Sequence, residues 1–215
     1  THVMGTIAGR AIVGADTQWI GCAPNAQWIA DRCVDQGFPI IPDFRDDVVE
    51  GYQWFADPDG NPNTMDDVPD VIQNSWGVTS GHVGTSCYDY WNTVIMNCEA
   101  AGPVVTWSAG NEGPTASSLR SPATYSINAT QIFSVGAVDA SAYPNTPYPI
   151  ASFSSRGPTT CVPALPDNIK PEICAPGVNV YSSIPGGGYS GSYSGTSMAG
   201  PHIAGVVALM REACP

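Results

Sequence analysis

Residues 194–202 read Ser-Gly-Thr-Ser-Met-Ala-Gly-Pro-His. A glycine turn leads into Ser197, and the residues after it predict a helix over 197–213 with one apolar face. Ser197 therefore stands at a helix N-terminus, where free backbone N–H groups favour a negative charge. A serine in that place can be a nucleophile that stabilises its own oxyanion. Taken alone, such a serine is more often only a helix cap.

Two other short segments supply the groups that a serine nucleophile needs. Residues 1–6 read Thr-His-Val-Met-Gly-Thr, and His2 could accept the hydroxyl proton of Ser197. Residues 107–113 read Trp-Ser-Ala-Gly-Asn-Glu-Gly, and the amide of Asn111 could donate to an oxyanion. Each segment alone has a plain structural interpretation, as a histidine beside small residues or as a turn asparagine. Together they predict nucleophilic catalysis.

The rest of the chain alternates between two periodicities. Apolar residues at helical spacing predict helices over 45–56, where Asp43 would be the N-cap, and over 90–101. Continuous β-prone runs predict strands over 70–77, 103–109 and 131–138. Such alternation is typical of βαβ units, so we expect a parallel sheet with helices on both faces.

These segments resemble the motifs of the subtilisin-like serine proteases, the peptidase S8 or subtilase family. Residues 195–202 match the family's nucleophile motif, 1–6 resemble the second half of its histidine motif, and 108–113 resemble its oxyanion-asparagine segment. Shorter matches follow in family order at 74–77, 134–138, 151–157 and 175–177. The sequence around Trp76 and at residues 170–172 is most similar to the bacillopeptidase F branch of the family.

The resemblance implies an α/β fold with three layers and a mostly parallel central sheet of seven strands. It implies Ser197 as the nucleophile, His2 as general base and acid, and Asn111 as an oxyanion donor. The implied protein is a secreted, monomeric serine endopeptidase that cleaves polypeptides through an acyl-enzyme. Its chemistry requires no cofactor, and a structural calcium ion is compatible with the resemblance but not indicated by the sequence.

The resemblance also assigns the residues that would bind the substrate. One edge would pair with the substrate backbone, and a wall opposite it would enclose the side chain before the cut. The edge comprises Ser75, Trp76 and Gly77, and the wall comprises Ser108, Ala109 and Gly110.

Two further positions bear on specificity. Glu112 would lie near the pocket floor, where a carboxylate could accept a lysine or arginine side chain; the alternative is a partly exposed glutamate without that role. Residues 37–39, Gly-Phe-Pro, fall where the family builds a second substrate-pairing strand. Because proline cannot donate to a ladder, that edge would be altered.

The family's catalytic aspartate has no counterpart in the sequence. In the subtilisin order the aspartate precedes the histidine, and only Thr1 precedes His2 here. Asp16, Asp31 and Asp139 stand in contexts unlike the aspartate motif. We therefore interpret residues 1–215 as a partial catalytic domain, truncated at both ends and lacking the first strand. Without the aspartate, little or no activity is expected of this chain.

Composition excludes several other classes of protein. The formal net charge is −12 with 7 Lys+Arg, which disfavours binding to nucleic acid or to anionic membranes. Gly 23 and Pro 20 make up a fifth of 215 residues, as in a loop-rich globular domain. The N-terminus has no signal-peptide pattern, and no apolar run is long enough to span a bilayer.

Seven cysteines leave at least one thiol unpaired within the chain. A disulfide between Cys87 and Cys98 is disfavoured, because a helix would hold them about 16 Å apart. We expect Cys33 to pair with Cys87 and Cys161 to pair with Cys174; buried free thiols are the alternative.

Other motifs have mainly structural interpretations. The acidic stretch 56–68 superficially suggests a calcium loop, but Gly60 is misplaced for one, and a solvated loop is favoured. His202 lies about 140° around the helix from Ser197, which favours a structural hydrogen bond. His82 is expected to be exposed in a glycine-rich loop. Asn128 begins an N-glycosylation sequon.

Two rival functions remain open. A catalytically inactive domain of the same fold could bind peptides along the edge formed by residues 75–77. A non-protease hydrolase could use a convergent Ser-His pair, but the usual G-x-S-x-G elbow is absent around Ser197.

Overall fold

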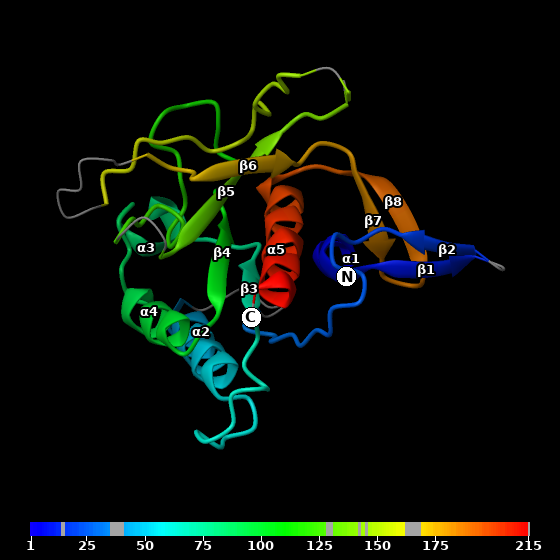
Figure 1. The fold of residues 1–215 in the computed structure, drawn as a ribbon. Coiled ribbons are helices and arrows are strands. Elements are labelled where there is room, and N and C mark those ends of the chain that lie inside the picture. The colour runs from blue at the N-terminus through cyan, green and yellow to red at the C-terminus, as the bar shows by residue number, and fades with distance from the viewer. Residues whose placement is uncertain are drawn as a thin grey trace.

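A four-stranded parallel sheet forms the centre of the computed structural model (Figure 1). The structure describes residues 1–13, 16–34, 41–127, 131–141, 143–144, 146–161 and 169–214. The central strands, in spatial order, are β3 (Val71–Asn74), β4 (Val104–Ser108), β5 (Phe133–Val138) and β6 (Ile173–Pro176). Most residues of β4 and β5 are buried and the others are partly buried, as expected for parallel strands covered on both faces.

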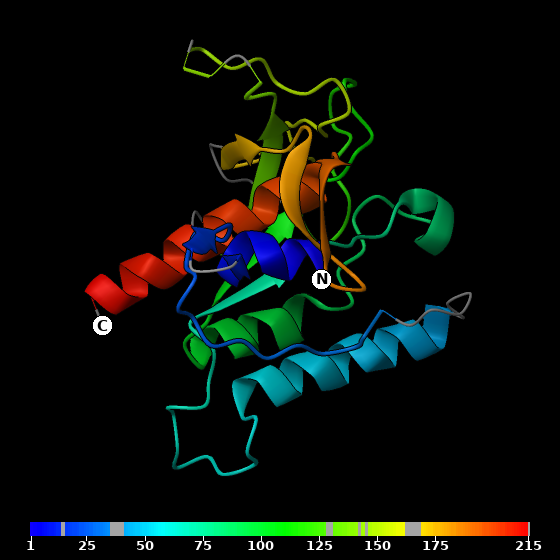
Figure 2. The same cartoon turned by 90° about the vertical axis from the view of Figure 1, so that its right-hand side faces the viewer.

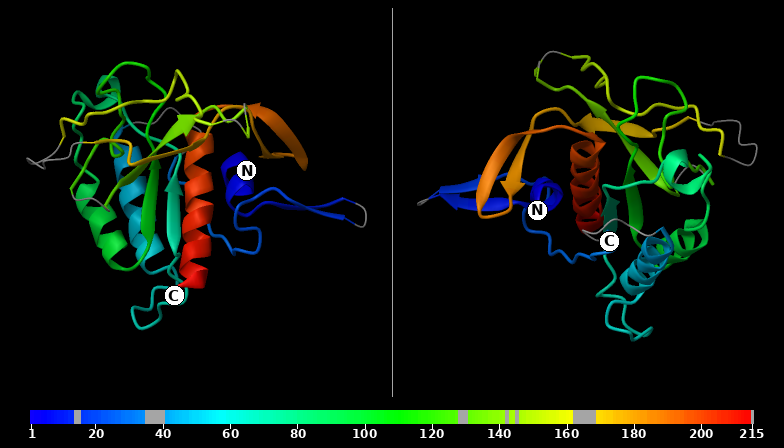
Figure 3. Two further views of the ribbon diagram at one scale, coloured as in Figure 1. Left: turned by 45° about the horizontal axis from the view of Figure 1, so that its top comes forward. Right: turned by 180° about the vertical axis from the view of Figure 1, so that it is seen from behind.

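Helices cover both faces of this sheet, which gives three layers (Figures 1 and 3). Helix α5 (Thr196–Ala213) packs against all four strands on one face. Helix α4 (Asn92–Ala100) packs on β4 from the other face, with α2 (Ile41–Ala56) against α4. The expected α/β fold with a mostly parallel sheet is therefore confirmed, although the central sheet of the described residues has four strands rather than seven.

The two faces of the sheet are packed with side chains of different size. On the side of α2 and α4, Trp91 and Trp107 are fully buried, and Trp76 packs edge-on against both. On the side of α5 the cluster contains small residues such as Ala137 and Ala199. These small residues let α5 lie close to the strands, so the start of the helix sits directly against the strand ends.

The N-terminal helix α1 (His2–Ala8) packs between α5 and an antiparallel hairpin (Figure 2). The hairpin consists of β7 (Val180–Ile184) and β8 (Gly188–Tyr193). A second ribbon, β1 (Arg10–Val13) with β2 (Asp16–Trp19), extends from α1. Gly205 of α5 closely approaches the carbonyl of Ile7, so the helices α1 and α5 meet with little side-chain bulk between them.

The ends of some elements differ from the prediction. Helix α2 begins at Ile41 instead of residue 45, and Asp43 lies in its first turn instead of capping it. A negative charge in the first turn interacts favourably with the helix dipole, so an aspartate is common there as well as at the cap. Residues 80–83 form a short helix, α3 (Ser80–Val83), where a glycine-rich loop was predicted. Residues 35–40 and 128–130, with the expected altered edge and the sequon, lie outside the described residues.

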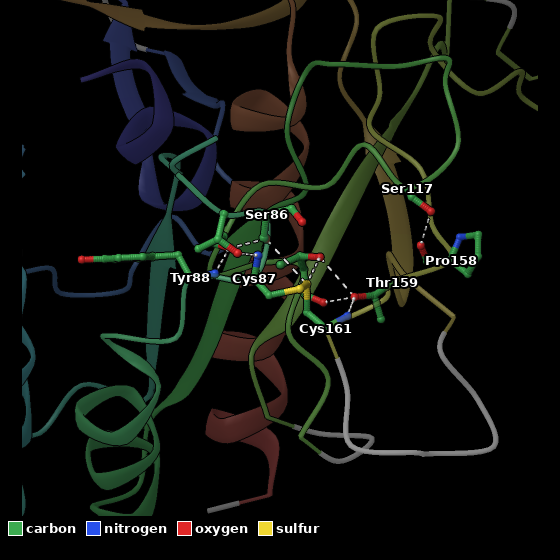
Figure 4. The surroundings of a disulfide bond; sticks show 10 residues. Ser86, Cys87, Tyr88, Ser117, Pro158, Thr159 and Cys161 are labelled. Carbon is green, nitrogen blue, oxygen red and sulfur yellow. Dashed lines mark hydrogen bonds between the residues drawn. A yellow bond between two sulfur atoms is a disulfide. The ribbon is translucent and has the colours of Figure 1, made fainter. Parts of the chain in front are cut away.

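The disulfide joins Cys87 to Cys161, so both expected pairings are wrong (Figure 4). The pairing with Cys33 assumed that this residue follows a strand, but the described segment before it, 20–33, contains none. Cys174 lies within β6, where its sulfur faces Gly136, while Cys161 lies beside Ser86. The other cysteines are free thiols, namely Cys22, Cys33, Cys98, Cys174 and Cys214.

Among the described residues, no helix combines the length and the apolar character that crossing a membrane would require.

Candidate active site

Ser197 occupies the first turn of α5, as the sequence predicts. Gly195 caps the helix with φ +156, which lets the chain turn sharply into it. The hydroxyl of Ser197 is half-buried and donates to the carbonyl of Ser75 at 3.3 Å. Its backbone N–H has no acceptor among the described residues, as expected in the first helical turn. An anion beside Ser197 would therefore find a free donor.

Asn111 lies on the turn after β4, held against the same helix start. Its Oδ1 accepts hydrogen bonds from the backbone N–H of Thr196 at 2.9 Å and from the Thr196 hydroxyl at 3.0 Å. The hydroxyl of Thr196 accepts in turn from the N–H of Gly110 at 3.2 Å. These bonds fix which way the amide faces, and they leave its Nδ2 donor near Gly195 without a partner among the described residues.

His2 is buried at the start of α1, but the structure does not bring it into hydrogen bonding with Ser197. Its Nε2 donates to the carbonyl of Val180 at 3.1 Å, and its ring lies 4.6 Å from that of Tyr193. Its Nδ1 is buried and has no partner among the described residues. In this arrangement the ring nitrogen that would serve as a base is engaged by β7.

The segments predicted to enclose a substrate side chain follow two neighbouring strands. Ser75, Trp76 and Gly77 follow β3, and Ser108, Ala109 and Gly110 lie at the end of β4 or directly after it. Within the described part of the chain, the N–H groups of Trp76 and Gly77 form none of the backbone hydrogen bonds found between segments. The two stretches therefore lie on adjacent strand ends, and the first keeps its backbone donors available.

Arg120 fills the space between these two stretches. A Cβ atom added to Gly77 would lie 2.9 Å from Cβ of Arg120, and one added to Gly110 would lie 3.1 Å from its Cγ. The backbone supports this position, since Arg120 N–H donates to the carbonyl of Ala109 at 3.2 Å. The side chain of Arg120 therefore limits the space between the two stretches.

The carboxylate of Glu112 is fully engaged by its neighbours. Its Oε1 forms an ion pair with the guanidinium of Arg120, whose Nε donates at 2.8 Å. Its Oε2 accepts from the backbone N–H of Asn111 at 2.9 Å and from the hydroxyl of Ser155 at 3.3 Å. A basic substrate side chain would have to compete with Arg120 for this carboxylate.

The other two histidines lie away from this chemistry. His202 donates from Nδ1 to the carbonyl of Met198 at 2.9 Å, the structural bond that its position predicts, and burial lowers the pKa of its ring. His82 is exposed, as expected, and accepts from the hydroxyl of Thr79 through Nδ1 at 2.9 Å.

The acidic loop between α2 and β3 brings three carboxylates together. One oxygen each from Asp57, Asp59 and Asp67 lie within 4.8 Å of one another. Asp59 also orders the loop, since it accepts from the N–H of Asn61 at 2.8 Å and from the hydroxyl of Thr64. Of the groups in the described residues, this one comes nearest to a metal-ligand arrangement.

Three residues near Ser197 were missed by the sequence reasoning. Thr196 orients Asn111, Arg120 closes the space beside Gly110, and Gln73 contacts the serines on both strand ends. Thr196 could have been noticed, because it lies inside the nucleophile motif. No motif around Arg120 or Gln73 indicates a role for them, because the contacts that matter form only when the chain folds.

Comparison with known proteins gives consistent matches over the whole chain. The model of the subtilase family, Peptidase S8, matches residues 1–215. Bacillopeptidase F of Bacillus subtilis (strain 168) is 37% identical over 223 residues, which cover 99% of this chain and 14% of that protein. Subtilisin E of the same organism is 33% identical over 216 residues, covering 100% of this chain and 46% of that protein. The chain thus spans less than half the length of these curated relatives.

Solved structures of similar fold agree with these matches. Sphericase superposes with a TM-score of 0.77 at 25% identity, covering 100% of this chain and 63% of that one. S41 psychrophilic protease superposes with a TM-score of 0.72 at 28% identity, covering 100% of this chain and 64% of that one.

Proposed function

The chain belongs to the subtilase family, and from this premise we propose that the protein is a serine endopeptidase that cleaves polypeptides through an acyl-enzyme on Ser197. The observation that carries the proposal is the position of the Asn111 amide against the first turn of α5. There a side-chain donor and the free N–H of Ser197 can serve the same oxyanion. A helix cap alone would not need such an arrangement.

In the proposed reaction, Ser197 Oγ attacks the carbonyl carbon of the scissile peptide while His2 takes the hydroxyl proton. The oxyanion accepts hydrogen bonds from Asn111 Nδ2 and from the Ser197 N–H. When the carbon–nitrogen bond breaks, His2 returns the proton to the leaving amine. A water molecule then attacks the ester carbonyl carbon while His2 takes a proton from it. His2 gives this proton to Ser197 Oγ when the ester bond breaks, which restores Ser197.

We propose that an aspartate from a part of the protein outside these 215 residues completes the triad. One observation supports this: Nδ1 of His2 is buried and has no hydrogen-bond partner among the described residues. A carboxylate bound to Nδ1–H would select the tautomer with a lone pair on Nε2. That tautomer cannot donate to Val180, so His2 would be free to turn toward Ser197.

The proposed substrates are polypeptides, whose backbone would pair with the edge at Ser75, Trp76 and Gly77. The pocket for the residue before the cut would lie between that edge and the wall at residues 108–110. We further propose a secreted, monomeric protein. The disulfide between Cys87 and Cys161 supports secretion, because such bonds persist in oxidising compartments.

An active-site label tests this function. A fluorophosphonate probe should modify Ser197 in the full-length protein, and Ser197→Ala should abolish the labelling. The hydrogen bond from His2 to Val180 favours one rival, an inactive domain that binds peptides. Peptide binding without any labelling of the full-length protein would establish that rival and reject the endopeptidase.

A further inference from the structure

A cluster of polar side chains lies between the strand ends and the start of α5, and no step of the proposed reaction assigns a role to these side chains. It consists of Gln73 on β3, Thr106 on β4 and the serines that follow or end these strands, Ser75 and Ser108. We call these four residues the amide–hydroxyl cluster. Thr106 is fully buried and Ser108 nearly so, so their polar groups depend on one another.

The amide of Gln73 has a fixed orientation within this cluster. The hydroxyl of Thr106 donates to Gln73 Oε1 at 2.7 Å. The opposite side of the amide, Nε2, then donates to the hydroxyl oxygens of Ser75 at 3.2 Å and of Ser108 at 3.4 Å. One glutamine thus joins the ends of two adjacent strands.

Each serine passes the interaction on to the turn that carries the nucleophile. Ser108 Oγ donates to the carbonyl of Thr196 at 3.0 Å, and Ser75 Oγ donates to the carbonyl of Ser197 at 3.3 Å. A hydroxyl has a single proton. Both serine oxygens accept a hydrogen bond from Gln73 Nε2. Each hydroxyl proton is therefore donated on the other side, to a backbone carbonyl at the start of α5.

The helix backbone also comes into direct contact with this amide. A Cβ atom on Gly200 would clash with Nε2, Cδ and Oε1 of Gln73. Gly200 lies about one turn after Ser197. The backbone of α5 can pack against Gln73 at this point only because Gly200 has no side chain. Gln73 therefore limits how closely α5 approaches the sheet, and through the two serines it also fixes the orientation of the first helical turn.

We propose that Gln73 is a positioning residue for Ser197. Through Ser75 and Ser108 it holds the carbonyls of residues 196 and 197, and through Gly200 it sets how far α5 enters. The inference rests on the proposed function, since it concerns the geometry of the same nucleophile. Misplacing a reacting atom by about 1 Å can cost about 100-fold in rate.

A purely structural role for Gln73 makes a different prediction. Loss of structural support lowers the fraction of molecules that fold, but each folded molecule keeps its turnover. Loss of positioning lowers the turnover of every folded molecule. Titrating the sites with a fluorophosphonate and dividing kcat by the titrated concentration separates the two roles.

The test uses Gln73→Met in the full-length protein, because methionine keeps the length of the side chain and removes its hydrogen bonds. We expect kcat per titrated site to fall about 10- to 100-fold, with KM within about twofold of the wild-type value. The matched control is Gln53→Met on the exposed face of α2, which should leave kcat unchanged. An unchanged kcat per titrated site in Gln73→Met would overturn the inference.

A second variant keeps the test valid if Gln73→Met does not fold. Thr106→Val removes the hydroxyl that orients the amide and leaves Gln73 in place. We expect a fall in kcat per titrated site in the same direction and of smaller size; no fall would overturn the inference. If the wild-type protein takes up no label, the proposed function fails and this inference fails with it, whereas a labelled wild type with unaffected variants rejects Gln73 alone.

Discussion

Thr196 holds Asn111 by two hydrogen bonds to a single oxygen, one from its backbone and one from its hydroxyl. The residues are 85 positions apart in the chain, and they join the turn after β4 to the start of α5. Since Oδ1 is occupied by Thr196, the amide can offer only Nδ2 to a substrate. A turn residue thereby becomes a donor with one fixed direction.

Replacing Asn111 with alanine should impair the reaction without weakening substrate binding. We expect kcat to fall by roughly 10²–10³-fold with little change in KM, the range known for loss of a side-chain oxyanion donor in a subtilisin. Steady-state kinetics of the full-length protein would measure this. Near-full turnover in a normally folded Asn111→Ala protein would refute the role of this amide.

Releasing Glu112 from Arg120 should change the preference for the residue before the cut. In Arg120→Ala the carboxylate of Glu112 loses its cation, so lysine in the substrate can take its place. We expect kcat/KM for lysine relative to phenylalanine to rise about 3- to 10-fold, which corresponds to about 1 kcal/mol for a partly exposed pair. Paired peptide substrates would measure the ratio.

The control for this change is a double variant. Adding Glu112→Gln to Arg120→Ala removes the carboxylate and should return the ratio close to its wild-type value. A ratio that stays high in the double variant would show that space, and not charge, governs the preference.

Removing the disulfide should destabilise the fold. Cys87 and Cys161 are 74 positions apart, so their bond closes a long loop in the unfolded chain. Replacing both with serine should lower the free energy of unfolding by about 2–4 kcal/mol. Chemical denaturation with and without a reductant would measure the loss, and the reductant should not weaken the double variant further.

Cys214→Ser provides the matched control, because this thiol is free and exposed. Its unfolding curve should coincide with that of the wild type. Equal stability of the Cys87/Cys161 double variant and the wild type would contradict the structural role of the bond.

Glu99 should make stability depend on pH. Burial raises the pKa of its carboxyl from 4.5 to about 7, although the N–H of Ile132 and the charge of Lys170 act in the opposite direction. A raised pKa means that the folded state favours the protonated acid. The stability that it contributes is present below pH 4.5 and is lost as the pH rises toward 7.

Glu99→Gln should remove this dependence, since glutamine can still accept from Ile132. We expect the variant to be more stable than the wild type at pH 8 by about 1–2 kcal/mol, a value reduced because the carboxyl is partly exposed. The two should match near pH 4.5. Lys170 is held by Glu172 and by the carbonyl of Ile132, each at 2.6 Å, and keeps both partners in the variant. Parallel stability curves from pH 4.5 to 8 would disprove the assignment.

Local patterns were sufficient to locate the elements that carry the site. The glycine turn before Ser197 and the apolar period after it are properties of adjacent residues, so α5 and its N-terminal serine were predictable. The same holds for β4 and the turn at Asn111. The alternation of such strands and helices also indicated the three layers.

The contacts made across the fold were not predictable in this way. Arg120 meets Glu112 only because the chain returns beneath the turn at Gly110, and no spacing in the sequence encodes that return. The partner of Cys87 depended on where a loop passes, and the assumption of a strand before Cys33 misplaced it. Such pairs follow from tertiary packing, which single-residue preferences do not describe.

The two residues proposed to exchange a proton lie far apart in the sequence, and this has a consequence for synthesis. His2 is held by Val180 and by Ser182, whose hydroxyl donates to its carbonyl at 2.8 Å. Contacts of such long sequence separation carry a loop-closure cost and cannot form before both segments have been synthesised. On the ribosome, a growing chain would lack hydrolytic capacity at least until β7 and the segment that carries Ser197 had emerged. The order of the sequence would thus delay proteolysis until the segments that hold the two residues have been made.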